Sequence, residues 1–285
     1  VPFLIAEVMA SNIGGVATLI GDPPNILIGS AAGLDFVAFL VNLAPVVVLV
    51  MVAFVVFVRL FLAHQLHVAL EAKETVMSLD EREVITDPSL MRKSLVVLGL
   101  TIVGFLLHGA LGYEPATIAL LGATVLMLVA KEDPHDALRE IEWPTIFFFV
   151  GLFILVGGVI EVGIIEQLAN WALDVTAGNL TLTVLLLLWL SAILSGFVDN
   201  IPYTATMIPL VEQLGEHMRV EPLWWALALG AGFGGNATII GAAANVIVAH
   251  LAEREGHPIT FGEFLKYGAG VTLFSIVIAT IYIWL

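Results

Sequence analysis

The sequence predicts an all-α polytopic membrane protein, with broken transmembrane helices and a re-entrant hairpin arranged as an inverted repeat. Three observations lead to this fold class. The 285-residue chain is 60% hydrophobic and only 12% charged, a composition typical of membrane proteins. Some apolar segments carry Gly, Pro and polar residues, although broken backbone is tolerated at membrane depth only against protein or a wet cavity. One such segment recurs 220 positions later.

The composition also excludes several classes of function. The net charge of −15 comes without the clustered Lys and Arg that nucleic acids or anionic lipids require. The chain has no Cys, which excludes disulfides, thiolate metal sites and a Cys nucleophile. It also lacks a phosphate loop, a zinc-type His/Glu motif and a nucleophile elbow. We therefore expect no enzyme, no cofactor and no nucleic-acid partner.

The recurring segment is the main functional signal. It reads SNIGGVATLIGDPPNILIG at Ser11–Gly29 and AGFGGNATIIGAAANVIVA at Ala231–Ala249. The identical positions are Gly14, Gly15, Ala17, Thr18, Ile20, Gly21 and Asn25, which match Gly234, Gly235, Ala237, Thr238, Ile240, Gly241 and Asn245. Two interrupted hydrophobic segments in corresponding places of two halves indicate the binding site of a secondary transporter. The alternative is that these Gly and small polar residues only pack helices together.

The repeat also predicts the domain organisation. Residues 1–63 would be the end of a first inverted repeat, 64–93 a cytoplasmic linker, and 94–285 the second repeat. The second repeat would contain scaffold spans over 94–162, an interfacial helix over 163–177, a re-entrant hairpin over 180–215, a broken helix over 222–250 and a last span over 261–285. Because little membrane sequence precedes the first copy, we expect about 130 residues before Val1, in a protein of about 410–430 residues.

The spans follow from length and apolar content. Phe36–Leu62 is long enough to cross a bilayer with some tilt, and the pair Leu95–Leu111 and Pro115–Ala130 is joined by a tight turn at Gly112. Trp143–Val162 is the next span. Gly163–Ala177 alternates apolar and polar residues at helical spacing, which predicts an amphipathic helix on the membrane surface.

The re-entrant hairpin is predicted from an interrupted apolar run. The stretch Val198–Pro202, VDNIP, divides Leu180–Leu214 into two arms, neither of which is a comfortable span of about 20 residues. Pro202 suits the first turn of a helix, so Asp199 and Asn200 would lie at the hairpin tip inside the membrane. With the linker cytoplasmic, Arg219 is the only basic residue outside, as the positive-inside rule requires.

Asp22 and Asp199 are the acids expected at membrane depth, where ionisable groups are costly and usually carry protons or ions. Asp199 would either hold a proton or stay ionised beside a cation; alternatively, it only caps the second hairpin helix. Asn236 of the second copy corresponds to Val16 of the first, so the two halves are not expected to coordinate the same ligand. His108, near the outer end of a span, is expected to be a satisfied interfacial histidine rather than a proton relay.

The full set of predicted substrate- or ion-binding residues comes from the two copies and the hairpin: Ser11, Asn12, Gly14, Gly15, Thr18, Asp22, Asn25, Asp199, Asn200, Thr204, Gly234, Gly235, Asn236, Thr238 and Asn245. Glycine permits close backbone approach, and Asn and Thr supply neutral ligands. No resident metal is expected, but Na⁺ could bind near Asp199, Asn200 and Asn245.

Three motifs carry a resemblance to a known family: AEVMASNIGGVATLIGDPPNILIG, FVDNIPYTATMIP and GGNATIIGAAANVIVA. They resemble the ion transporter superfamily with the citrate-transporter-like domain, and within it the branch of ArsB/NhaD-type permeases and the melanosomal P protein. The resemblance covers almost the whole chain. It implies two inverted repeats, each with a hairpin and a broken helix, in a homodimer of the cell (inner) membrane that moves by an elevator motion.

One departure from the family concerns the substrate. The dicarboxylate and citrate branch usually carries Ser-Asn-Thr at the hairpin tip, whereas this chain has Asp199-Asn200-Ile201. An acid repels a di- or tricarboxylate and favours a cation or proton. The resemblance therefore implies arsenite-type oxyanion efflux or sodium/proton antiport, with H⁺ or Na⁺ as coupling ion. A citrate-like symporter and an ion channel are the alternatives.

Overall fold

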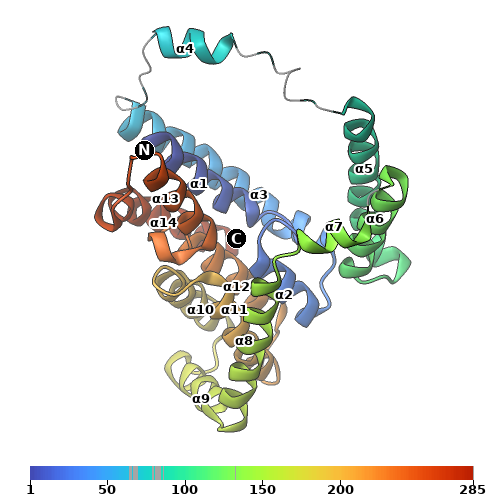
Figure 1. Cartoon of the computed structure of the whole chain (residues 1–285). Helices are drawn as coiled ribbons and strands as arrows, with labels where there is room; N and C mark the ends of the chain where they lie inside the picture. The colour runs from blue at the N-terminus through green and yellow to red at the C-terminus, as the bar shows by residue number, and fades with distance from the viewer. Residues whose placement is uncertain are drawn as a thin grey trace. The chain divides into compact units, whose positions relative to one another are not determined.

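The structure is a computed structural model that describes residues 1–63, 66, 70–78, 80, 85, 87–131 and 133–284. Over these residues it is all-α and contains no strand (Figure 1). Four helices are long and apolar enough to cross a membrane, which confirms an all-α polytopic membrane protein. They are α3 with its π-helical extension η1 (Phe36–Phe57 and Val58–Leu62), α5 (Pro88–Leu111), α8 (Trp143–Glu161) and α14 (Phe261–Trp284).

Both copies of the repeated motif interrupt a helix. The first lies between α1 (Pro2–Gly15) and α2 (Pro23–Ala32). The second lies between α12 (Glu221–Gly234) and α13 (Ala243–Arg254), with one 3₁₀ turn, η4 (Ile239–Gly241), inside the break. The four half-helices pack crosswise, with α1 against α13, α2 against α12, and α1 against α12. This exchange of partners is the arrangement expected of two copies related by a two-fold axis.

The predicted hairpin is formed by α10 (Leu180–Ser195) and α11 (Asn200–Gly215), of 16 residues each. At about 1.5 Å per residue each arm is about 24 Å long, which is less than the hydrocarbon core of a bilayer. Small residues hold α10 close to α12. A Cβ atom on Gly234 would lie 2.6 Å from the carbonyl oxygen of Ala192, so only glycine fits there.

Helix α12 lies at the centre of this part of the molecule. All its residues from Leu223 to Gly234 are buried, and it contacts α1, α2, α10, α11 and α14. Helices α3 and α14 run antiparallel beside it, because the Tyr282 hydroxyl donates to the Asn42 carbonyl at 2.9 Å while Phe57 contacts Phe274 near their other ends.

The segment predicted to be an amphipathic helix forms α9 (Ile164–Thr176), which packs on α10 and α11. Its protein-facing residues are Ile165, Ala169, Ala172 and Thr176. The larger apolar residues of the helix, Ile164, Leu168, Trp171 and Val175, are exposed in this chain. An exposed apolar stripe beside a polar face suits a helix at a membrane surface.

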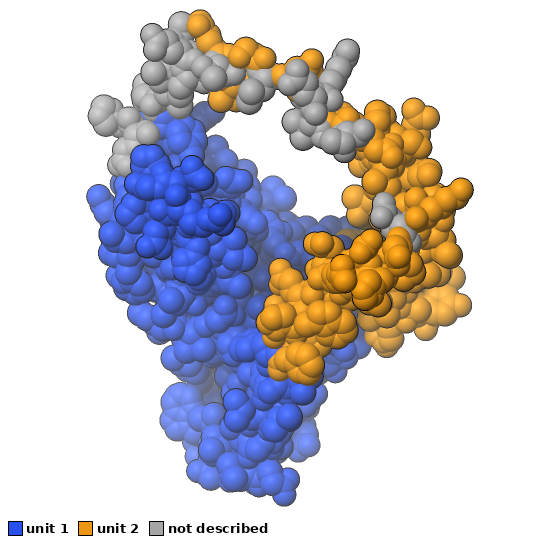
Figure 2. All heavy atoms as spheres, viewed as in Figure 1, with its two compact units in different colours: residues 1–34, 38–66, 148–285 blue, residues 35–37, 67–147 orange. Residues whose placement is uncertain are grey.

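Residues 35–37 and 67–147 form a second compact unit (Figure 2). It contains the antiparallel pair α5 and α6 (Pro115–Ala130), which meet where Gly104 faces Ile118 and Gly122 faces Thr101. His108 is satisfied as expected: Phe36 N–H donates to its Nε2 at 3.0 Å, and its Nδ1 contacts the Tyr113 carbonyl at 2.9 Å.

Two details of this unit differ from the sequence prediction. Helix α5 begins at Pro88 rather than near Leu95, so the end of the predicted linker 64–93 is helical, because Asp87 caps the helix through the N–H groups of Ser89 and Leu90. The rest of that linker contains α4 (Leu70–Met77), and His64, His67 and Arg82 lie outside the described residues.

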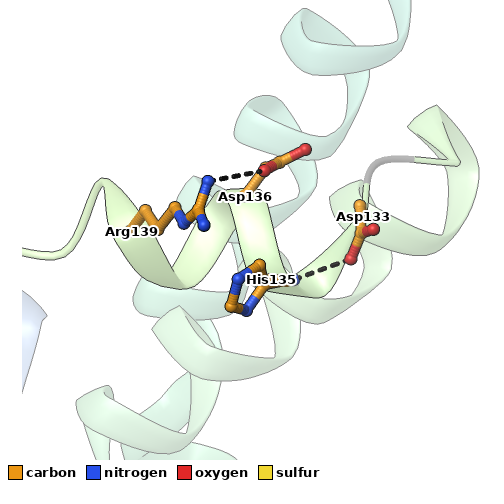
Figure 3. Close-up of polar contacts among 4 residues, drawn as sticks. All are labelled: Asp133, His135, Asp136 and Arg139. Carbon is orange, nitrogen blue, oxygen red and sulfur yellow. Dashed lines mark hydrogen bonds and ion pairs between the residues drawn. The ribbon is translucent and has the colours of Figure 1, made fainter.

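The second difference is a short helix in the charged connection after Ala130. Helix α7 (Pro134–Arg139) begins where the Asp133 carboxylate accepts from the His135 N–H at 2.8 Å (Figure 3). Arg139 and Asp136, one turn apart, are 3.9 Å from each other and largely exposed. An exposed ion pair of this kind contributes about 0–1 kcal/mol, so we assign this loop no function.

Candidate functional site

The two breaks close in the same way. In the first, the chain folds back so that Gly15 and Gly21 touch, and a Cβ atom on Gly15 would lie 2.7 Å from the Gly21 carbonyl oxygen. In the second, a Cβ atom on Gly241 would lie 2.7 Å from the Gly235 carbonyl oxygen. The spacing G-x5-G in both copies is therefore required by this backbone contact.

The asparagine occupies the same position in both copies of the motif, and this also has a structural reason. The Asn25 Nδ2 donates to the carbonyl oxygens of Val16 at 3.1 Å and Thr18 at 2.9 Å, and more weakly to that of Gly15. The break frees the Val16 carbonyl from the helix, and the buried amide satisfies it; the Thr18 carbonyl also accepts from the Gly21 N–H at 3.2 Å. Asn25 therefore holds the first break closed from inside.

Asn245 does the same in the second break. Its Nδ2 donates to the carbonyl oxygens of Gly235 at 2.8 Å and Thr238 at 2.9 Å. The helix-packing alternative thus accounts for part of the repeated motif, because its Gly and Asn residues shape the backbone. It does not account for the polar side chains that the two breaks position, which are described next.

The hairpin tip meets the first break. Asn200 Nδ2 donates to Asp22 Oδ2 at 3.2 Å, and Asp199 lies close enough for the two carboxyl groups to interact electrostatically. Asp22 is the N-cap residue of α2 but makes no capping bond to it, whereas Asp199 caps α11 by accepting from Ile201 N–H at 2.9 Å. Two helix N-termini and two carboxyl groups therefore converge, and no ion pair within the described residues reaches either acid.

Thr204 adds a buried hydroxyl group to this cluster. It lies one turn after Asn200 on α11, so the two side chains share a helix face. Thr204 is fully buried, and among the described residues its Oγ1 is the one buried side-chain oxygen or nitrogen without a hydrogen-bond partner. An unpaired buried hydroxyl costs about 1–3 kcal/mol, so it suits a group that a ligand completes.

A second polar cluster joins the two broken helices. Asn12 Nδ2 donates to Asn236 Oδ1 at 3.0 Å and to Asn245 Oδ1 at 2.9 Å. Asn236 Nδ2 donates to the Met9 carbonyl at 3.4 Å, so both ends of its buried amide are held by α1. The structure thus places Asn245 with Asn12, and its amide bonds reach neither Asp199 nor Asn200.

The remaining predicted residues have supporting or peripheral positions. Thr238 fastens the hairpin to the second break, because its buried hydroxyl donates to the Gly196 carbonyl at 2.5 Å. Thr18 is partly exposed beside Gly21, and Ser11 and Gly14 are exposed. Gly234 serves the contact with α10 described above. Within the described ranges, no group of three or more His, Asp or Glu side chains could hold a metal ion.

The sequence reasoning missed one contact that matters. Gly232 packs directly against the Val16 side chain. Gly232 corresponds to Asn12, and Val16 to Asn236, at the 220-residue offset. The contact between Gly232 and Val16 is therefore the counterpart of the contact between Asn12 and Asn236. Both pairs lie within the aligned copies Ser11–Gly29 and Ala231–Ala249, so the signal was present in the positions that differ between the copies.

Comparisons with known proteins agree with the resemblance seen in the sequence. Residues 1–230 match the family described as "CitMHS: Citrate transporter". The "Uncharacterized transporter Rv2684" of Mycobacterium tuberculosis is 48% identical over 99% of this chain and 67% of its own. The "46 kDa membrane protein" of Mycobacterium leprae is 46% identical over 100% of this chain and 67% of its own.

A more distant relative comes from an animal. The "P protein" of Mus musculus is 32% identical over 98% of this chain and 43% of its own. Together with the apolar helices, these relatives identify an integral, multi-pass membrane protein of a transporter family. The chain belongs to the citrate transporter (CitMHS) family within the ion transporter superfamily.

Proposed function

We propose that this protein is a secondary active ion transporter in which Asp22 and Asp199 carry the coupling cation, H⁺ or Na⁺. The observation that carries the proposal is the meeting of the hairpin tip with the first break, where Asn200 bonds Asp22 beside Asp199. Ionised carboxyl groups at membrane depth are costly and usually mark ion or proton pathways. With no basic partner among the described residues, a mobile cation is the simplest compensation.

The cargo we propose is a small inorganic ion or oxyanion, carried by sodium/proton antiport or arsenite-type efflux. Two carboxyl groups within reach of each other repel a di- or tricarboxylate when ionised. The crosswise packing of α1 with α13 and of α2 with α12 supports an inverted-repeat architecture, as secondary transporters of this kind require. A homodimer remains part of the proposal through the family resemblance.

Citrate-like symport is the second candidate. The N-termini of α2 and α11 converge on the site, and helix N-termini attract carboxylates. The family description also names citrate. This alternative requires that Asp22 and Asp199 be neutral, or be paired with cations, when the substrate binds.

The test uses the full-length protein in everted membrane vesicles with a pH-sensitive dye. Na⁺, Li⁺, arsenite and citrate are added in turn to wild type, Asp22→Asn, Asp199→Asn and a matched control, Asp174→Asn, which makes the same change on the exposed face of α9. We expect proton movement on addition of Na⁺ or Li⁺, lost in the two site variants and kept in the control. That result would identify cation/proton antiport.

Two other results would point to a different function. Without a response to Na⁺ or Li⁺, uptake of radiolabelled arsenite into the same vesicles, lost in Asp199→Asn, would identify oxyanion transport. Uptake of radiolabelled citrate that survives in both site variants would overturn the role assigned to the two acids.

A further inference from the structure

The three-asparagine cluster, Asn12, Asn236 and Asn245, differs from the carboxylate site in having no formal charge. Asn12 Nδ2 lies between two amide oxygens, at 3.0 Å from Asn236 Oδ1 and 2.9 Å from Asn245 Oδ1. A partly positive NH₂ group thus stands between two oxygens whose orientation is fixed. The opposite ends of Asn236 and Asn245 are tied to backbone carbonyls of Met9, Gly235 and Thr238.

Asn12 is the most exposed member of the cluster. It is partly exposed, whereas Asn236 and Asn245 are buried. Its own Oδ1 has no hydrogen-bond partner among the described residues. The χ2 torsion of asparagine is broad and roughly two-fold, so a half-turn exchanges the nitrogen and oxygen with little torsional resistance. The half-turn breaks the two hydrogen bonds that Asn12 donates, and a bound cation would replace them. After that half-turn, three amide oxygens point at one position.

The surrounding backbone favours positive charge at this position. The C-terminal end of α1 at Gly15 and that of α12 at Gly234 both lie at the breaks, and the two helices contact each other. Helix C-termini carry partial negative charge, and in broken-helix transporters they coordinate Na⁺. A site of neutral oxygens gives no advantage to a divalent ion, because nothing there neutralises a second charge.

We propose that Asn12, Asn236 and Asn245 form a binding site for one dehydrated monovalent cation, and that rotation of the Asn12 amide opens it. In the structure the Asn12 NH₂ group satisfies the two amide oxygens that the cation would bind. The site is single, because the symmetry-related contact between Gly232 and Val16 is apolar. Cation binding at this site does not depend on Asp22 or Asp199. The part of the site in ion coupling rests on the proposed transport function.

The test measures cation binding without transport. The full-length protein is purified in detergent, and its Tm is measured in NaCl, LiCl or KCl against choline chloride at equal ionic strength. We expect one of these cations, at ten times its Kd, to raise Tm by roughly 3 °C or more. Asn12→Leu should lose the rise, while Asn12→Asp, which has the same shape, should show a larger rise because its carboxylate is repelled by the two oxygens until a cation binds.

Two controls separate this site from its surroundings. Val16→Ala alters the apolar counterpart of the contact and should keep the wild-type rise. Asp199→Asn removes the acid at the hairpin tip, and in that background Asn12→Leu should lower the rise as much as it does in wild type. The proposal is wrong if no cation raises the wild-type Tm, if Asn12→Leu keeps the full rise, or if Asp199→Asn abolishes it. These outcomes are independent of vesicle transport, so each proposal can fail without the other.

Discussion

The break between α1 and α2 and the break between α12 and α13 share one backbone but carry different chemistry. In each, two glycines touch and an asparagine amide pairs with the freed carbonyls. Three of the pairs that differ replace a side chain that makes a hydrogen bond across the site with an apolar residue: Asn12 and Gly232, Val16 and Asn236, and Asp22 and Ala242. At each pair one half is polar and the other is apolar.

This comparison separates the residues that fix the backbone of a break from the side chains that the break turns towards its neighbours. The shape requires Gly and Asn at fixed spacing, which is why those residues are identical in both copies. The presented chemistry is unequal, because the first break offers a carboxyl group to the hairpin tip and the second offers an amide to α1. A transporter built this way would use its two halves for different ligands.

The largest expected effect comes from breaking the shared shape. Gly21→Ala and Gly241→Ala should each prevent folding, because the new Cβ atom meets the backbone oxygen of Gly15 or Gly235. Overpacking commonly costs about 1–3 kcal/mol, and more where neither side can move. Yield of monodisperse protein in size-exclusion chromatography measures the effect. Gly151→Ala, where nothing lies within 4 Å, should behave as wild type. Normal yield of either closure variant would show that the breaks are less tightly packed than described.

Removing the carboxyl group at position 22, or adding one at position 242, should separate the effect on transport from the effect on stability. Asp22→Asn keeps an oxygen to accept from Asn200, so the protein should fold but lose ion-coupled transport. Ala242→Asp puts a carboxyl group at the corresponding position, which is buried. An uncompensated buried charge costs about 3–5 kcal/mol, so this variant should be the less stable of the two by thermal unfolding. Equal stability would indicate that both breaks tolerate an acid.

Much of this arrangement could be predicted from the sequence. The positions of α3, α6, α8, α9 and α14, the two breaks and the 16-residue hairpin arms follow from apolar length, proline placement and the repeat. The pairing of Asp199-Asn200 with Asp22 did not follow, because local patterns carry no information about which half-helices meet. The roles of Asn25 and Asn245 were also hidden, since an amide that binds ions and one that binds carbonyls look the same in a sequence.

The asparagines allow a finer test of the comparison. Asn25→Ala and Asn245→Ala should each destabilise the protein by about 1–3 kcal/mol, because the first removes the amide from the Val16 carbonyl and the second removes it from the Gly235 carbonyl. Combined with Asn12→Ala in double-mutant cycles, only Asn245 should show a coupling energy, of about 0.5–3 kcal/mol. The cycle with Asn25 should be additive within about 0.5 kcal/mol, since Asn12 makes no hydrogen bond to it. Equal coupling in both cycles would mean that Asn12 acts through the whole break rather than through one amide.

The smallest difference is expected at the two threonines of the motif. Thr238 donates to the Gly196 carbonyl at 2.5 Å and is buried, so Thr238→Val should cost about 1–3 kcal/mol by leaving that carbonyl unpaired. Thr18 makes no hydrogen bond through its hydroxyl within the described residues and is partly exposed, so Thr18→Val should change stability by about 0.5 kcal/mol or less. Chemical denaturation of the two purified variants compares them directly. The two variants make the same change at matching positions of the two breaks. A larger loss of stability at Thr18 would mean that the first break also holds a hairpin tip through its threonine. The two breaks would then differ in chemistry only at the three substituted pairs.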